Sequence, residues 1–145
     1  MALMTLVLAG CGAAGEAPTS DPWTIEGAVR DLPPDIERTE GRPGENGGTV
    51  LESSSVQIEE GTAYRFSLGH CGLFSPVDLD GSFWDAVEGH DADGRPIDLR
   101  THVEMINATS GLIAVVGDEA RFRTDSGLVV RFERVFGSKE FPACG

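Results

Sequence analysis

The sequence predicts a mainly β fold, a small antiparallel sandwich or barrel with little or no helix. Residues 49–145 contain short runs in which apolar and polar residues alternate, the pattern of half-buried strands. Turn residues separate these runs at intervals of about 8–12 residues, which is typical of small all-β domains. No stretch sustains the three- and four-residue apolar spacing of an amphipathic helix. One domain fits this length.

The strongest strand predictions lie in the middle and last third of the domain. In order, the predicted strands are 63–68, 112–116, 120–124 and 128–133, and the last three are connected by turns at 117–119 and 125–127. In the first of them, Tyr64, Phe66 and Leu68 share one face. In the later ones, Arg121, Arg123 and Arg131 alternate with apolar residues and should face outward.

Other strand predictions rest on shorter patterns. Val56 and Ile58 suggest a weak strand. The apolar pair Val77 and Leu79, followed by Asp80-Gly81, predicts a hairpin into Phe83, Trp84 and Val87, because Asp-Gly between apolar runs favours a tight turn. A further strand is predicted from Val103, Met105 and Ile106, and a further turn at Asp93-Gly94.

The N-terminal residues resemble the signal peptide of a bacterial lipoprotein. An apolar stretch from Ala2 ends in Leu8-Ala9-Gly10-Cys11, which resembles a lipobox. This resemblance implies cleavage before Cys11 and lipidation of its sulfur. Residues 1–10 are shorter than an ordinary leader of about 15–30 residues and contain no Lys or Arg, so we expect either an upstream start or a poorly processed leader. The alternative is an apolar N-terminal strand that happens to end in Cys.

The same residues match a dinucleotide-binding pattern that we reject. Gly10 to Gly15 has the spacing G-x-G-x-x-G, but this motif requires its third glycine to open a helix. Pro18 and Pro22 follow within a few residues and prevent a helix from propagating. The sequence therefore predicts no nucleotide cofactor.

The charge balance limits the partners. The chain has 24 acidic and 11 basic residues, a formal net charge of −13. Nucleic acid is not expected to bind, because binding phosphates needs clustered Lys and Arg. A polybasic contact with lipid headgroups is also not expected, so the membrane contact would be the N-terminal lipid. The expected location is the extracytoplasmic face of the cell membrane.

The two remaining cysteines are expected to form a disulfide. An exported protein places Cys71 and Cys144 in an oxidising compartment, where a bridge over a long loop would contribute roughly 4 kcal/mol by chain entropy. The alternative is two reduced, buried thiols. Neither cysteine has C-x-x-C spacing, so redox catalysis and a zinc site lack support.

Residues 11–48 are predicted to be an acidic linker that begins with the lipidated cysteine. Prolines and glycines are frequent here and apolar side chains are few, so this segment has little to bury. One stretch, Trp23 to Val29, alternates enough to form a short strand and to pack on the domain. The domain boundaries are therefore 1–10, 11–48 and 49–145.

Residues 62–135 resemble a group of small actinobacterial proteins that are secreted or lipid-anchored and have no assigned function. The most specific part is His70-Cys71-Gly72, followed by Asp80-Gly81 and Trp84. The resemblance also uses Ala120 to Phe122 and Gly127 to Phe132. It implies a β-rich exported domain and transfers no catalytic residue. The charged segment 89–99 departs from the group's usual Pro, Gly and Trp-rich turn.

No motif for catalysis or metal binding stands out. His90-Asp91-Ala92-Asp93-Gly94 has carboxylates near a glycine, but aligning Gly94 with the invariant glycine of a calcium loop puts Arg100 where the bidentate Glu should be. We expect solvated turns instead. His70, His90 and His102 lack ligand spacing, and His70 is expected to pack or hydrogen-bond near the disulfide. An enzyme remains open but disfavoured, and would need His70 or His102 near Asp78 or Asp80.

Two classes of function remain. The first is a non-enzymatic interaction or structural module that contacts an envelope protein, with Phe83 and Trp84 as the expected contact surface, because two successive strand residues point to opposite faces. The second is a carrier that holds a small apolar ligand in a cavity lined by Phe66, Phe83, Trp84 and Phe122. A solid core with an exposed aromatic patch favours the module, and a deep cavity favours the carrier.

Overall fold

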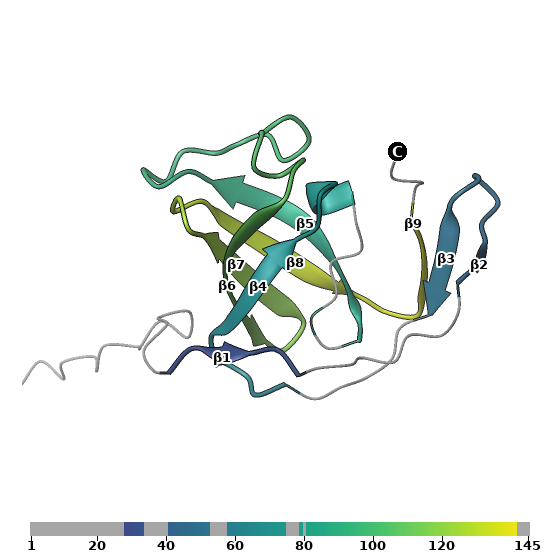
Figure 1. The fold of residues 1–145 in the computed structure, drawn as a ribbon, viewed down its shortest axis with the longest axis horizontal. Coiled ribbons are helices and arrows are strands. Elements are labelled where there is room, and N and C mark those ends of the chain that lie inside the picture. The colour runs from purple at the N-terminus through teal and green to yellow at the C-terminus, as the bar shows by residue number, and fades with distance from the viewer. Residues whose placement is uncertain (1–27, 34–40, 53–57, 75–78, 80, 142–145) are drawn as a thin grey trace, which may run out of the picture.

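The computed structural model describes residues 28–33, 41–52, 58–74, 79 and 81–141, which form two β-sheets (Figure 1). The strands are β1 (Arg30–Asp31), β2 (Arg42–Pro43), β3 (Thr49–Glu52), β4 (Tyr64–Leu68), β5 (Phe83–His90), β6 (Thr109–Val116), β7 (Glu119–Thr124), β8 (Val129–Val135) and β9 (Ser138–Phe141). In the described residues, helix is limited to the single 3₁₀ turn η1 (Gly72–Phe74). The mainly β prediction is confirmed.

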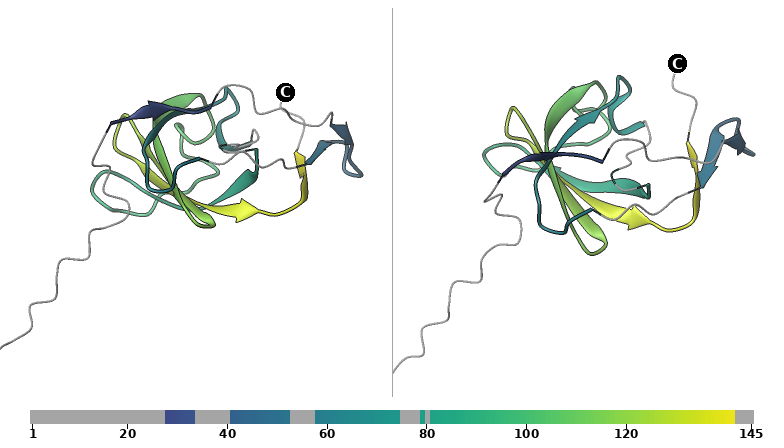
Figure 2. Two further views of the ribbon diagram at one scale, coloured as in Figure 1. Left: turned by 90° about the horizontal axis from the view of Figure 1, so that it is seen from below. Right: turned by 60° about the horizontal axis from the view of Figure 1, so that its bottom comes forward.

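The two sheets pack as a sandwich-like fold and do not form a closed barrel. The larger sheet has the order β1-β4-β6-β7-β8-β5, and the smaller has the order β2-β3-β9. Neighbouring strands are antiparallel except for β1, which pairs parallel to β4. Figure 2 shows the smaller sheet to one side of the larger in both views.

The alternating pattern correctly identified the inner face of the larger sheet. Tyr64 and Leu68 are buried on β4 while Arg65 and Ser67 are exposed, and Phe66 is partly buried. The core cluster contains Tyr64, Leu68, Leu79, Trp84, Met105, Ile113, Val115, Ala120, Phe122, Leu128, Val130 and Phe132. The predicted turns 117–119 and 125–127 connect β6 to β7 and β7 to β8. Gly117 and Gly127 have φ of 60° and 97°, which favours glycine there.

The smaller sheet covers part of the outer face of β5. The rings of Phe83 on β5 and Phe141 on β9 pack edge to face with centroids 4.9 Å apart. The Lys139 ammonium on β9 forms an ion pair with Asp85 on β5. The β5 strand is therefore covered on both faces at this end, and β9 joins the two sheets.

The predicted hairpin before β5 lies mostly outside the described residues, and only its Leu79 and Gly81 can be placed. Leu79 lies in a bend and is fully buried, whereas β5 pairs with β8 in the antiparallel direction. Val77, Asp78 and Asp80 lie outside the described residues. The local Asp-Gly sequence could not reveal that the distant strand β8 provides the pairing edge. The register joins Phe83 to Val135 and His90 to Val129.

The predicted strand at Val103, Met105 and Ile106 is wrong, because residues 101–107 form successive turns. Asp98 starts them: its side chain accepts a hydrogen bond from the Arg100 amide at 2.9 Å, and its carbonyl accepts one from the His102 amide at 2.9 Å. Local bonds of this kind compete with a strand ladder. Met105 is buried in the core even though it lies in a turn.

Part of the segment predicted as a linker belongs to the sheets. β1 pairs with β4 through Arg30 and Tyr64, and β2 pairs with β3 through Arg42 and Val50. The predicted stretch from Trp23 to Val29 lies mostly outside the described residues, and its last two residues are not in a strand. Ile58 is also outside any strand, and Val56 lies outside the described residues.

Candidate functional site

The predicted contact pair, Phe83 and Trp84, is not at the surface. Phe83 is 0% exposed and Trp84 is 2% exposed. The two side chains do point to opposite faces of β5, as expected, but Trp84 enters the main core while Phe83 is covered by Phe141. The expectation of an exposed aromatic is therefore wrong, because the second sheet could not be foreseen from the alternation along β5.

The four aromatic residues that were expected to line a cavity for an apolar ligand do not enclose one. A side chain with no accessible surface touches no space large enough for a water molecule, and Phe83 and Phe122 are both 0% exposed. Phe66 packs edge to face against Phe122, with ring centroids 5.5 Å apart. These rings fill the interior.

The residues of the predicted lipidation and disulfide sites lie largely outside the described part of the chain. Cys11 and Cys144 are both outside it, as are Asp78 and Asp80. Cys71 is described, and its Sγ lies 3.3 Å from Nε2 of His70. This agrees with a histidine that interacts beside the cysteine.

The histidines of the described residues are not part of a metal-binding group. Within the described residues, no group of three or more His, Cys, Asp or Glu side chains could hold a metal ion. His102 has a buried Nδ1 atom without a hydrogen-bond partner, while its backbone N–H donates to Asp98 O. His90 forms an isolated antiparallel β-bridge with Pro96 across the turn.

The acidic loop after β5 is a set of turns, as predicted. The Asp91 carboxylate accepts hydrogen bonds from the amides of Asp93 and Arg95 at 2.9 and 2.8 Å. Gly94 has φ of 80° and donates its amide to Asp91 O. Asp93 pairs with Arg95 at 2.5 Å. The carboxylates of this loop therefore hold a turn.

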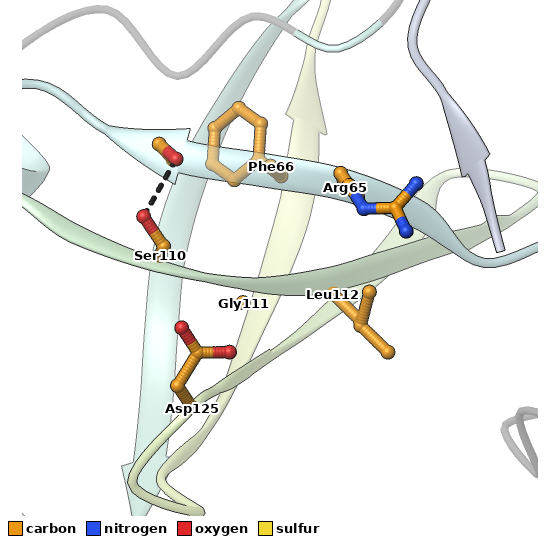
Figure 3. A pocket seen from close by; sticks show the side chains of 7 residues that line it. Arg65, Phe66, Ser110, Gly111, Leu112 and Asp125 are labelled. Carbon is orange, nitrogen blue, oxygen red and sulfur yellow. Dashed lines mark hydrogen bonds between the residues drawn. The ribbon is translucent and has the colours of Figure 1, made fainter.

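A polar hollow lies on the outer face of the larger sheet, where β4 and β6 meet the turn between β7 and β8. Its volume is about 340 Å³, at the lower end of the range for small-molecule sites. Its lining residues are Arg65, Phe66, Ser67, Ser110, Gly111, Leu112 and Asp125. Figure 3 shows Arg65 and Phe66 on β4, and Asp125 with its carboxylate directed toward β6.

Small side chains create this hollow. The hydroxyls of Ser67 and Ser110 face each other across β4 and β6 at 2.8 Å (Figure 3). Gly111 keeps the strands close, since a Cβ built there would lie 2.1 Å from Arg123 O. The Asp125 amide donates to Ser110 O at 3.0 Å, which fixes the start of the turn beside the serines.

The register arranges the outward residues in two rows. One row contains Ser67, Ser110 and Asp125, and the other contains Arg65, Leu112 and Arg123. Arg65 pairs with Asp31 at 3.4 Å. In the described part of the chain, neither the Asp125 carboxylate nor the Arg123 guanidinium has a hydrogen-bond or ion-pair partner. The hollow thus offers the unpaired Asp125 carboxylate and two hydroxyls. Arg123 is not one of its lining residues, but it lies next to Leu112 in register and so stands beside the hollow.

Sequence reasoning placed Arg65, Ser67 and Arg123 on outward faces but did not find the hollow. The alternation within each strand gives the face, and only the pairing between strands shows which outward residues are neighbours. Ser67 and Ser110 are separated by 43 positions in the sequence, so no local pattern reveals their contact.

A second depression lies along the free edge of β5, between Ala86–His90 and residues 96–100, with a volume of about 530 Å³. A bulge interrupts the pairing of β5 with β8 between Ala86 and Glu88. The Ile97 amide donates to Gly89 O at 2.9 Å and closes one end of this edge. A bulge and a covering loop are common ways to protect a sheet edge.

Comparisons with known proteins found no matching family model, no similar curated protein and no similar solved structure. The described residues contain no helix that is long and apolar enough to cross a membrane.

Proposed function

We propose that the protein is a lipid-anchored module on the extracytoplasmic face of a bacterial cell membrane, with a role in binding rather than catalysis. The observation that carries the proposal is the sequence Leu8-Ala9-Gly10-Cys11 after an apolar stretch, which resembles a lipobox. Lipidation of Cys11 supplies the membrane contact, since two acyl chains hold a protein stably at a bilayer.

The domain supports a binding role through its solid interior and its outer face. The aromatic side chains fill the core, so an apolar ligand has no space among Phe83, Trp84 and Phe122. Ligands or envelope proteins must therefore contact the surface, where the hollow provides the hydroxyls of Ser67 and Ser110 and the unpaired carboxylate of Asp125. Because the net charge is −13, anionic polymers such as nucleic acid are unsuitable partners.

A disulfide between Cys71 and Cys144 is part of this proposal. Cys144 follows the end of β9 by three residues, and β9 carries Phe141, which covers Phe83. A bridge from Cys144 to Cys71 would hold the C-terminal strand against the larger sheet. The oxidising environment outside the cell favours such a bond.

Fractionation of cells tests the anchor. The full-length gene, with its natural upstream sequence, is expressed in an actinobacterial host as the wild type and as Cys11→Ser. We expect the wild type in the membrane fraction and the Cys11→Ser variant outside it, with Cys71→Ser as the control that keeps the anchor. Equal distribution of the wild type and Cys11→Ser would refute lipidation at this residue.

A further inference from the structure

We propose that the hollow on the outer face binds a small zwitterion of the α-amino acid class. Its ammonium group would contact the Asp125 carboxylate and its apolar side chain the surface of Leu112, both of which line the hollow. Its carboxylate would contact the guanidinium of Arg123, which pairs in register with Leu112 and stands beside the hollow. This inference goes beyond the membrane anchor and names a ligand for the proposed binding module.

The first argument is that two opposite charges lie close together without pairing. Arg123 lies on β7 and is exposed, and Asp125 follows two residues later at the start of the turn. Alternate residues of a strand are about 6.7 Å apart along the chain. No ion pair joins them, and neither side chain has another partner in the described residues. A molecule that carries both charges would satisfy both groups at once.

The second argument is the arrangement between these charges. Leu112 pairs in register with Arg123, and the Ser110 carbonyl accepts the Asp125 amide at 3.0 Å. The apolar side chain of Leu112 therefore lies next to Arg123 in register, and the serine pair Ser67 and Ser110 lies next to Asp125. Ser67 and Ser110 can each redirect a hydroxyl toward an ammonium or carbonyl group of the ligand, because hydroxyl protons rotate freely.

The third argument concerns charge. Every other described Lys or Arg except Arg100 has a carboxylate within 4 Å, so Arg123 is unusual in an acidic protein. The net charge of −13 would repel a simple anion from Arg123. A zwitterion has no net charge, and its ammonium group is attracted to the same face. A ligand with both charges fits this surface better than an anion.

The test is a titration of the full chain with three probes, followed by NMR amide shifts. L-leucine carries both charges, leucinamide lacks the carboxylate, and N-acetylleucine lacks the ammonium. Because exposed ion pairs are weak, we expect a Kd for leucine of about 1 mM, with each analogue binding about fivefold more weakly. The shifted amides should be those of Ser110, Gly111, Arg123 and Asp125.

Two variants assign the charges. Asp125→Asn should bind leucine about fivefold more weakly and no longer distinguish it from N-acetylleucine, while still rejecting leucinamide. Arg123→Gln should also bind leucine about fivefold more weakly, but it should no longer distinguish leucine from leucinamide while still rejecting N-acetylleucine. Arg100→Gln, which removes another unpaired cation outside this hollow, should bind leucine as the wild type does. These exchanges are at exposed positions, so the fold is retained, and the NMR spectra report this directly.

The proposal is overturned if leucine causes no saturable shifts, if the three probes bind equally, or if the shifts fall along β5 and residues 96–100 instead. Each result concerns only the hollow. A negative result would leave the fractionation of Cys11→Ser unaffected, so failure of this site and failure of the membrane anchor are distinguishable.

Discussion

The guanidinium carbon of Arg134 lies 4.3 Å from the centroid of the Trp84 ring. Arg134 also pairs with Asp118 at 3.2 Å and donates to the Ser82 hydroxyl and to Gly117 O. This single side chain connects the start of β5 to the turn between β6 and β7. It also closes one end of the core over Trp84.

Replacing Arg134 with Leu should loosen this end of the core. The cation–π contact and the hydrogen bonds are lost, while the apolar volume is largely kept, so we expect a loss of about 1–3 kcal/mol in the free energy of unfolding. Urea unfolding measures the loss, and the Trp84 indole NMR resonance should shift. Arg100→Leu is the control at an exposed position and should change stability by less than about 0.5 kcal/mol.

Phe141→Ala should detach the smaller sheet from β5. Phe141 is 7% exposed and covers Phe83, so the exchange removes a buried ring and uncovers another. We expect a destabilisation of about 3–5 kcal/mol in chemical denaturation. Phe136→Ala provides the control, because Phe136 is 73% exposed. Equal effects of the two variants would contradict the role of Phe141 between the sheets.

Glu140 should make the stability depend on pH at the acidic end. Partial desolvation raises the pKa of its carboxyl, but hydrogen bonds from the Asn46 amide, the Gly48 amide and the Asn46 side chain outweigh this and lower the pKa below its ordinary value of 4.5. The ionised form therefore stabilises the fold at neutral pH, and this contribution is lost as the pH falls through the lowered value.

Urea midpoints at pH 7 and pH 3 check the role of Glu140. The wild type should lose more stability between these two pH values than Glu140→Gln does. Asp125→Asn serves as a control, because the Asp125 carboxylate accepts no hydrogen bond in the described residues. An identical loss in the wild type and Glu140→Gln would show that the contacts with Asn46 and Gly48 do not stabilise the charged form.

Gly111→Ala should disturb the floor of the hollow. A Cβ at this position would lie 2.1 Å from Arg123 O, so β6 and β7 would have to separate. We expect a destabilisation of about 1–3 kcal/mol, as for other overpacked sites. The neighbouring exchange Ser110→Ala removes only an exposed hydroxyl contact and should have a smaller effect. Thermal unfolding of both variants tests the difference.

The sequence allowed a good prediction of the strands that have one buried face. Residues 64–68 and the strands β7 and β8 alternate along the chain, and the structure places their apolar side chains in one core. The period of two is directly visible in such strands, and their turns have the expected residues. The local sequence was therefore sufficient for their position and for their buried faces.

The features of the fold and of the hollow that were not predicted depend on contacts between segments far apart in the sequence. β9 was not predicted, because its four residues, Ser138 to Phe141, bury only Phe141 fully. Since β9 covers β5, Phe83 is interior and the expected contact surface is absent. Met105 is buried from a turn and was mistaken for a strand residue. The hollow requires the pairing of β4 with β6, which no local pattern reveals.

The most direct test of the central proposal is the native intact mass of the mature protein, extracted gently from the envelope of its own host. We predict a chain that begins at Cys11, with the added mass of its acyl chains and with Cys71 and Cys144 oxidised. A chain that retains Met1 and carries no acyl mass would contradict the lipid anchor and the extracytoplasmic location.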